Sequence, residues 1–564
     1  MHHHLTLRNK LIIMLSVMAS LFLVALDQTI IATALGKIVE EFNAFESLSW
    51  IVTAYLLTTT VTVPIAGKLS DLFGRRTLLL IGVTVFGVGS LLSGMAGTID
   101  QLIYARAFQG IGGGIITANA FTIVGDLFAA RERGKWQGIM GAVFGLSSIV
   151  GPLLGGWLTD GHGLLGVTTD WRWTFFINVP VAIVAFILIA IYSPSLRHKK
   201  KSRVDYTGAA LLTLALATLV LAVDNTESIF QGFLDASGWS LTGLRVAMFS
   251  IVAASVAGFI WVEKKASEPI LPITFFKNRN FVRIMGIATL FGAGFMGAIL
   301  YLTQFNQQVF GATPTESGLM LLPMVAGLMT TSIVSGQIIS RTGRYKIFMQ
   351  VGIVVATIMV ALLTTLTPDR SYLYEAIIMV LLGAGLGVVM PVMNLAVQNE
   401  FEQQDIGVAT SSSQLFRSLG STIGIAVFGA VLTAGLTTKL NETIHTDAYL
   451  QTLQSSPAAK RLGDLSDSNT LLNLNMHDTK ERINKQFAAS VRTLPAAQQT
   501  VATKQFKAQQ QSYADKVTEA FSDSLRKLFG VSAVLMLIAA GLVFSLKENP
   551  LRAAKPTDTP GEEA

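Results

Sequence analysis

The chain has no cysteine in its 564 residues, which excludes disulfides, thiol nucleophiles and thiolate metal sites. It also lacks a Gly-x-x-x-x-Gly-Lys-Ser/Thr loop for nucleotide phosphates, so ATP does not drive this chain directly. Neither a cluster of histidines and carboxylates with ligand spacing nor a nucleophile constellation is present. We therefore expect no enzyme activity, no metal, no cofactor and no nucleotide as a partner.

Charged residues are also scarce. They make up 14% of the chain and hydrophobic residues 51%, whereas soluble domains have about 25% charged residues. Apolar stretches of about 17–25 residues are long enough to cross a membrane. Such stretches begin near Leu11, Trp50, Thr77, Leu102, Gly134, Trp173, Tyr206, Gly243, Phe281, Gly318, Lys346, Leu373, Gly407 and Leu528. The sequence predicts an all-α integral membrane protein with about fourteen spans.

Lysine and arginine gather in alternate loops, after spans 2, 4, 6 and 10 and before span 9. These residues are Arg75, Arg76, Arg131, Arg133, Lys135, Arg197, Lys199, Lys200, Lys201, Arg203, Lys264, Lys265, Lys277, Arg279, Arg341, Arg344 and Lys346. The positive-inside rule then places both termini in the cytoplasm, and we expect a multi-pass protein of the bacterial inner membrane. Contact with anionic membrane lipids accounts for the net charge of +7, so no nucleic-acid partner is needed.

An internal repeat divides the chain. The loop after span 2 reads Gly67-Lys-Leu-Ser-Asp-Leu-Phe-Gly-Arg-Arg, and the loop after span 10 reads Gly336-Gln-Ile-Ile-Ser-Arg-Thr-Gly-Arg. The copies lie eight spans apart, whereas two six-span halves would place them six apart, so two spans are inserted. We expect a six-span N-terminal half at 1–195, a linker with two inserted spans at 196–265, and a six-span C-terminal half at 266–564. The substrate path then lies between the halves.

The first copy resembles the cytoplasmic signature of the major facilitator superfamily. Gly67 and Gly74 permit close helix approach and a tight turn. Asp71, Arg75 and Arg76 can form a charge relay that latches the cytoplasmic ends of neighbouring spans. The resemblance implies the major facilitator fold, with two six-helix halves and here two inserted helices.

Spans 4 and 5 resemble two further signatures of this family. In span 4, Arg106 lies about one turn inside an apolar helix, where a charge is costly unless it faces a cavity or a partner. The family associates this arginine with proton transfer; a structural or snorkelling arginine is the alternative. Span 5 has the antiporter pattern of small residues and a proline, which favours a seam that can rock between conformations. Its members are Gly138, Ser147, Gly151, Pro152, Gly155 and Gly156.

Span 1 contains Leu26-Asp27-Gln-Thr29, which resembles the signature of the fourteen-span drug:proton antiporters. We interpret Asp27 as the only carboxylate well inside an apolar span. Burial favours the protonated form of a carboxylate and a cation favours its charged form. Competition between proton and cation for Asp27 is therefore a sufficient mechanism for exchange. A structural aspartate, hydrogen-bonded to Thr29 or to a neighbouring helix, is the alternative.

The resemblance implies a multidrug efflux protein, a monomer that exports small amphipathic, lipophilic or cationic molecules against protons, with the proton gradient as its energy source. Export of a lipid, glycolipid or secreted metabolite is an alternative, which an ordered external hairpin would favour. A non-transporting receptor or scaffold is a further one. Polar and aromatic residues on core spans are candidates for the substrate cavity, namely Trp50, Tyr55, Asn119, Gln304 and Asn394.

One long polar segment, at about 436–527, interrupts the apolar pattern and lies on the external side. Its stretch from Ala514 to Phe529 has helical apolar spacing that continues into the last span. The segment is either a helical hairpin over the exit or a mobile loop.

Overall fold

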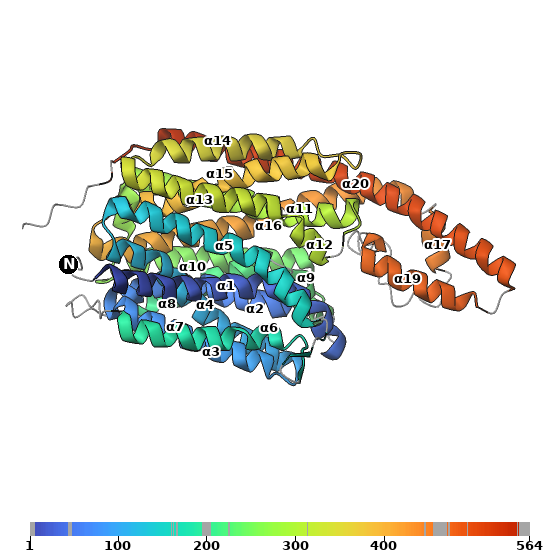
Figure 1. Cartoon of the computed structure of the whole chain (residues 1–564), viewed down its shortest axis with the longest axis horizontal. Coiled ribbons are helices and arrows are strands. Elements are labelled where there is room, and N and C mark those ends of the chain that lie inside the picture. The colour runs from blue at the N-terminus through green and yellow to red at the C-terminus, as the bar shows by residue number, and fades with distance from the viewer. Residues whose placement is uncertain are drawn as a thin grey trace, which may run out of the picture.

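The computed structural model describes residues 6–42, 48–159, 161, 163–164, 167–193, 205–223, 226–312, 314–444, 447–454, 471, 474–492, 495–549 and 551. Its elements form an elongated bundle of nearly parallel helices, with an arm that projects from one end (Figure 1). The basic linker expected at 197–203 lies outside the described residues.

The helices of the first part of the chain are α1 (Leu7–Phe42), α2 (Leu48–Phe73), α3 (Arg75–Gly94), α4 (Ile99–Leu127), α5 (Ala130–Thr159), α6 (Trp173–Phe176) and α7 (Asn178–Tyr192). Two short strands, β1 (Gly163–Leu164) and β2 (Val167–Thr168), pair antiparallel between α5 and α6. Next come α8 (Tyr206–Val223), α9 (Thr226–Ser237) and α10 (Leu241–Glu263).

The remaining elements are the 3-10 helix η2 (Ile273–Lys277), α11 (Arg279–Val309), α12 (Pro314–Leu319), α13 (Leu322–Thr342), α14 (Lys346–Leu363), α15 (Tyr372–Asn399), the 3-10 helix η3 (Gln403–Asp405), α16 (Ile406–Ile444), α17 (Ala448–Gln454), α19 (His477–Ser490) and α20 (Ala496–Ser545). Helices dominate because hydrocarbon offers no water to backbone amides, so each span must satisfy its hydrogen bonds internally.

Among the described residues, 12 helical segments are long and apolar enough to cross a membrane. They comprise α1 to α5, α6 with α7, α8, α10, α12 with α13, α14, α15 and α20. The two other expected spans, near Phe281 and Gly407, coincide with α11 and α16, which are not among the 12. The last helix begins at Ala496, far before the expected Leu528, because the external helix and the final span are continuous.

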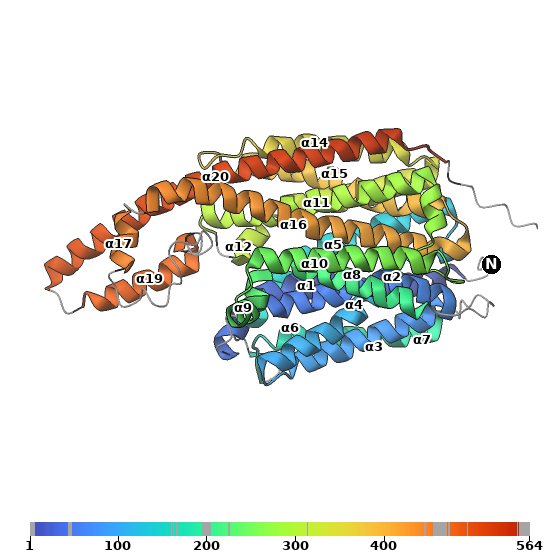
Figure 2. The ribbon, with the colours of Figure 1, turned by 180° about the vertical axis from the view of Figure 1, so that it is seen from behind.

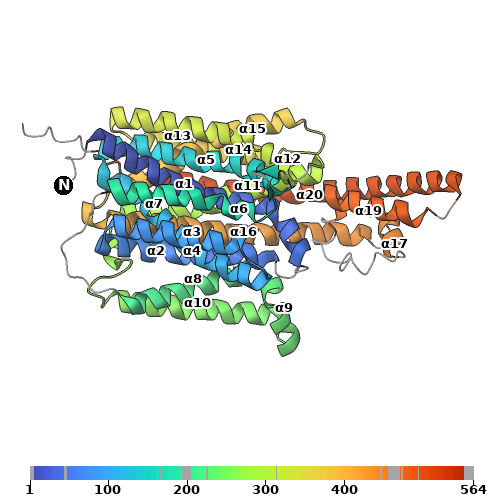
Figure 3. The same ribbon diagram turned by 60° about the horizontal axis from the view of Figure 1, so that its bottom comes forward.

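The bundle consists of two groups of helices. Helices α1 to α5 and α7 pack together, as do α11, α13 to α16 and α20. The groups meet where α5 packs against α13 and α15, and where α2 packs against α16. Helices α8 and α10 pair along the edge of the bundle, beside α2 and α16 (Figures 2 and 3).

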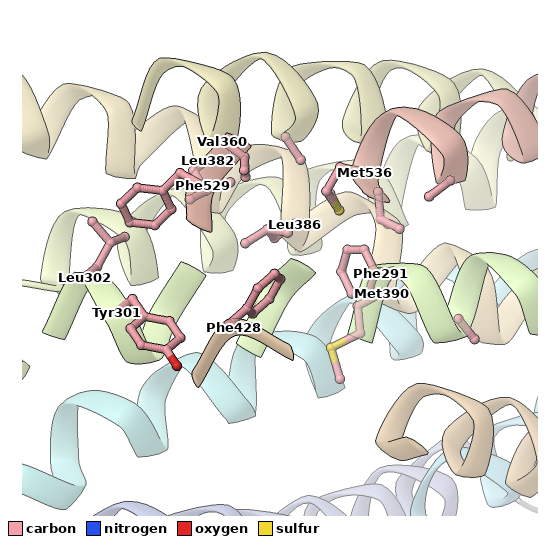
Figure 4. Close-up of a cluster of buried hydrophobic side chains, with 14 of the residues drawn as sticks. Phe291, Tyr301, Leu302, Val360, Leu382, Leu386, Met390, Phe428, Phe529 and Met536 are labelled. Atoms are coloured by element: carbon pink, nitrogen blue, oxygen red, sulfur yellow. The ribbon is translucent and has the colours of Figure 1, made fainter. Parts of the chain in front are cut away.

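The interior of the second group is built from large apolar side chains (Figure 4). Phe291 on α11, Leu386 on α15, Phe428 on α16 and Met536 on α20 are each at most 2% exposed. Lipid tails are as apolar as these side chains, so the hydrophobic effect contributes little to their burial between helices. Close packing between the helices holds them together instead. The second group therefore has a continuous apolar core.

The arm consists of α17, α19 and the first half of α20, at the end of the bundle opposite the N-terminus (Figures 1 and 2). It has its own aromatic core: Phe487 stacks on Phe506 with ring centroids 3.9 Å apart, and Tyr449 lies 5.4 Å from Phe506. Lys516 pairs with Asp447 at 3.0 Å. The described part of 436–527 is thus a helical hairpin, not a structureless loop.

Candidate functional site

Asp27 and Arg106, expected separately to couple protons, form a direct ion pair. Nη1 of Arg106 on α4 donates to Oδ2 of Asp27 on α1 at 2.5 Å. The side chains of Asp27 and Arg106 are 0% and 1% exposed. A buried charge is stable only when it is paired and hydrogen-bonded, so each residue explains how the other is tolerated.

Two amides complete the surroundings of the Asp27 carboxylate. Gln109, one turn after Arg106 on the same face of α4, donates from Nε2 to Oδ1 at 2.8 Å. Asn178, the first residue of α7, donates to the same oxygen at 3.4 Å and to Oγ of Ser90 at 3.0 Å. The carboxylate therefore accepts hydrogen bonds from α4 and α7, and these donors stabilise its charged form.

The guanidinium of Arg106 has aromatic and carbonyl neighbours besides Asp27. It lies 4.3 Å from the ring centroid of Tyr55 on α2, a distance at which a cation–π contact stabilises a desolvated cation. Its Nη1 also donates to Oε1 of Gln109 at 2.9 Å, and Nε donates to the carbonyl of Ile51 at 3.4 Å. The site thus joins α1, α2, α4 and α7 around one pair of charges.

A hydrogen bond connects this site to the seam on α5. Thr29, two residues after Asp27, donates to the carbonyl of Ser147 at 3.0 Å. A Cβ added at Gly151 would meet the side chain of Thr29, so α1 and α5 are in contact there. The Asp27 segment of α1 is therefore in direct contact with α5.

The other face of α5 meets the second helix group. Oγ of Ser332 on α13 donates to the carbonyl of Gly138 at 2.8 Å. Pro152 lies against Gly318 on α12, and Gly134 contacts Gly336 through the backbone. Small residues let α5 and α13 touch along their length. Gly155 is buried and Gly156 half-buried on the same helix.

The expected latch residues gather at the end of the bundle where the chain starts. Arg75 forms ion pairs with Asp71 and, from Nε at 2.7 Å, with Oδ2 of Asp126 on α4. Oδ2 of Asp71 accepts from the backbone N–H of Val408 at 3.1 Å, at the start of α16. Arg76 donates to the carbonyl of Ala190 on α7 at 2.5 Å. The latch therefore ties α2, α3 and α4 to α16 of the other group.

The two copies of the repeat have glycines at equivalent places in the structure. Gly74 and Gly343 have φ of 93° and 71° where a helix ends or begins, a conformation that favours glycine. Gly67 on α2 packs against Gly407 and Ser411 on α16, and Gly336 on α13 packs against Gly134 on α5. Each copy places its first glycine where the two helix groups meet.

The chain is similar to known proteins. A model of the Major Facilitator Superfamily matches residues 17–425. The chain is 36% identical over 553 residues to the multidrug transporter protein MdtP of Bacillus subtilis, a match that covers 96% of this chain and 94% of that one. The chain belongs to the Major Facilitator Superfamily. It is also 35% identical over 453 residues to multidrug resistance protein 3 of Bacillus subtilis, with 80% of this chain and 85% of that one covered.

The fold of this facilitator agrees with solved structures. The human organic anion transporter MFSD10 (TETRAN) superposes with a TM-score of 0.56 at 16% identity, over 74% of this chain and 93% of that one. An identity this low shows the fold alone. The chain is thus a multi-pass membrane protein of the facilitator type.

The five candidate cavity residues of this facilitator are not gathered at one point. Tyr55 stacks on Arg106, and Trp50 is half-buried at the start of the same helix. Asn119 is buried on α4, where it donates to the carbonyl of Ile115 at 2.8 Å. Gln304 on α11 is half-buried and Asn394 on α15 is 4% exposed. Within the described residues, no hydrogen bond or ion pair joins Asn119, Gln304 or Asn394 to Asp27, so their role as substrate contacts stays a prediction.

Several site residues of this facilitator were missing from the sequence-based candidates. Gln109 could have been found, because it lies three residues after Arg106 and so on the same helix face. Asn178 and Asp126 could not, since only tertiary packing brings them to Asp27 and Arg75. The interpretation of Asp27 as the only carboxylate well inside a span is wrong: Glu375, one turn into α15, is also 0% exposed.

Proposed function

We propose that this facilitator exports lipophilic, cationic small molecules in exchange for protons. The observation that carries the proposal is the buried ion pair of Asp27 and Arg106. A proton on Asp27 neutralises the carboxylate and ends its attraction to Arg106. A cationic substrate at the same carboxylate favours the charged form, so proton and substrate compete for one group. The multidrug names of the Bacillus relatives support this substrate class.

The contact of Thr29 with Ser147 supplies the coupling step. Whether Asp27 is paired with Arg106, with a substrate cation or with a proton changes the position of its segment of α1. Thr29 passes that change to α5, and the small residues of α5 and α13 form the surface along which the two helix groups rock. Exchange then requires no covalent chemistry and no energy source besides the proton gradient.

The membrane arrangement is part of the proposal. With α11 and α16 included, the chain has fourteen spans, in halves at 1–195 and 266–564 with α8 and α10 inserted between them. The arginines and lysines at the latch end place that end, and both termini, in the cytoplasm by the positive-inside rule. The protein then lies in the bacterial inner membrane as a monomer, with its arm outside and anionic lipids around its basic loops.

Transport in proteoliposomes tests the proposal. An imposed pH gradient should drive a cationic dye in wild-type protein and not in Asp27→Asn, while neutral drugs and lipids complete the substrate panel. Asp100→Asn, at the start of α4, is the matched control and should transport like wild type. Equal gradient-driven transport by wild type and Asp27→Asn would exclude Asp27 as the exchange site.

The helical arm makes a lipid or glycolipid a second candidate cargo, since an ordered external hairpin can guide such a molecule away from the membrane. The match to MdtP, however, covers 96% of this chain and therefore includes the arm. A relative with a multidrug name thus has a segment of corresponding extent, which is why drug export is preferred. Lipid export without dye export in the same panel would reverse this order.

A further inference from the structure

A second carboxylate lies buried in the other helix group, far along the chain from Asp27. Glu375 is four residues into α15 and 0% exposed, and Asn306, one turn before the end of α11, is also 0% exposed. One terminal atom of the Asn306 amide lies 2.9 Å from Oε1 and 3.0 Å from Oε2 of Glu375. The pair therefore joins α11 to α15 at the end of the bundle that bears the arm.

Glu375 differs from Asp27 in having no positively charged partner within the described part of the chain. Asp27 is paired with Arg106, whereas no charged side chain in the described part of the chain interacts with Glu375 from α5, α11, α13, α14 or α16, the helices packed on α15. Its titratable neighbour is Tyr372 on its own helix, whose hydroxyl donates to the carbonyl of Met320 at 2.8 Å. An ionised carboxylate without a positively charged partner is costly to bury.

An amide suits both states of a carboxyl group. The NH₂ of Asn306 can donate to an ionised Glu375, and the carbonyl oxygen of Asn306 can accept from a protonated one. A lysine or arginine would serve only the ionised form. When Glu375 gains or loses a proton, rotation of the Asn306 amide keeps a hydrogen bond between the same two residues.

The position of the pair suits exchange of protons with the external side. Phe310 lies one turn beyond Asn306, and its ring centroid is 6.4 Å from that of Tyr372, one turn outside Glu375. These two rings lie at the ends of α11 and α15 that face the arm (Figure 1). Gln308, two residues from Asn306, accepts from Asn475 of the arm at 2.8 Å. Parting α11 from α15 at this end would expose Glu375 to external water.

We propose that Glu375 is a second proton-binding group of the transport cycle, and that its protonation lets α11 and α15 close against each other at the external end. The inference rests on the proposed exchange of substrate for protons. When the external end is open, external water supplies a proton to the carboxylate and the neutral acid buries against Asn306. When the acid ionises, its O–H bond breaks, the proton passes to water, and the hydrated carboxylate holds α11 and α15 apart.

Infrared spectroscopy of the purified full chain tests where the proton resides. The difference between the spectra of wild type and Glu375→Gln should contain the carbonyl band of a buried carboxylic acid, and Asp27→Asn should keep that band. Asp369→Asn, an exposed acid in the loop before α15, is the matched control and should keep the band as well. A difference spectrum between wild type and Glu375→Gln without such a band would overturn the assignment of the proton.

Distance measurements test the closure. Because the chain has no cysteine, labels placed at Val309→Cys and Leu373→Cys are the only labelled sites. Between pH 9 and pH 5 the label distance should shorten in wild type and in Asp369→Asn, and should stay short throughout in Glu375→Gln, whose amide mimics the neutral acid. An unchanged pH response in Glu375→Gln would overturn the proposal.

Neither measurement requires a transported substrate, so the two proposals can fail separately. Wild-type protein that closes with pH but shows no gradient-driven export would refute the proposed exchange and leave the switch intact. Wild-type protein that exports dye while Glu375→Gln keeps its full gradient dependence would refute only the role of Glu375.

Discussion

In the ion pair of Asp27 and Arg106, replacing Asp27 should lower the free energy of unfolding by more than replacing Arg106 does. In Asp27→Asn, Arg106 stays charged, because a guanidinium does not lose its proton in proteins. It keeps only Oε1 of Gln109, the carbonyl of Ile51 and the face of Tyr55 as partners. Breaking one side of a buried pair costs about 3–5 kcal/mol, and we expect Asp27→Asn to lower the free energy of unfolding by that amount.

The reverse change should cost less. In Arg106→Gln the stranded carboxylate still accepts from Gln109 and Asn178, and it can become neutral by taking a proton from water. We therefore expect a loss of about 1–3 kcal/mol, the cost of an imperfectly satisfied buried polar group. This loss should shrink as the pH falls, since acid supplies the proton.

Equilibrium unfolding in detergent, followed by helix content, measures both losses and that of the double variant. The double variant removes both charges, so its loss should fall short of the sum of the single losses by at least about 1 kcal/mol, the coupling of residues in contact. Losses that add to within about 0.5 kcal/mol would show that the charges act independently. A larger loss for Arg106→Gln than for Asp27→Asn would refute the argument from proton exchange.

Further changes test the contact between α5 and α13, the ion pair of Arg172 with Glu41, and the arm. Gly138→Val should separate α5 from α13 and reduce dye export at least about tenfold, because small residues permit that contact, while Gly530→Val, which has open space, should not. The Arg172 hydrogen bond to Glu41 holds the pKa of that carboxyl below 4.5. Its stabilising contribution is therefore complete above that pH and disappears as the pH falls through the lowered pKa, so Arg172→Gln should be less stable than wild type at pH 7, by a difference that narrows in acid. Phe506→Ala should destabilise the arm by about 3–5 kcal/mol and speed its limited proteolysis; an unchanged cleavage rate would mean that the aromatic core does not hold the arm.

Features with a local sequence signal were predictable. Apolar runs located the spans because one helix of suitable length satisfies a membrane by itself. The Gly-Arg turns at Gly74 and Gly343 could be placed because a positive φ demands glycine there. Arg106 stood out because a charge within an apolar helix is rare.

Features that depend on helix register were not predictable. Asp27 and Arg106 were both nominated, but nothing in their spacing showed that they face each other, because the rotation of α1 against α4 is set by packing over the whole bundle. Glu375 escaped notice for a different reason. It lies so near the start of α15 that the sequence does not distinguish it from a solvated residue at a helix end. Only the contact with α11 buries it.

Helix α20 has no joint between the membrane and the arm. Its 50 residues span about 75 Å at 1.5 Å per residue, and about half of that length extends beyond the bundle (Figure 1). A tilt of the membrane-embedded part by roughly 10°, in the range of domain rotations, would sweep the tip of the arm through about 6 Å. A small rotation of the membrane-embedded half of α20 therefore becomes a larger displacement at the tip of the arm.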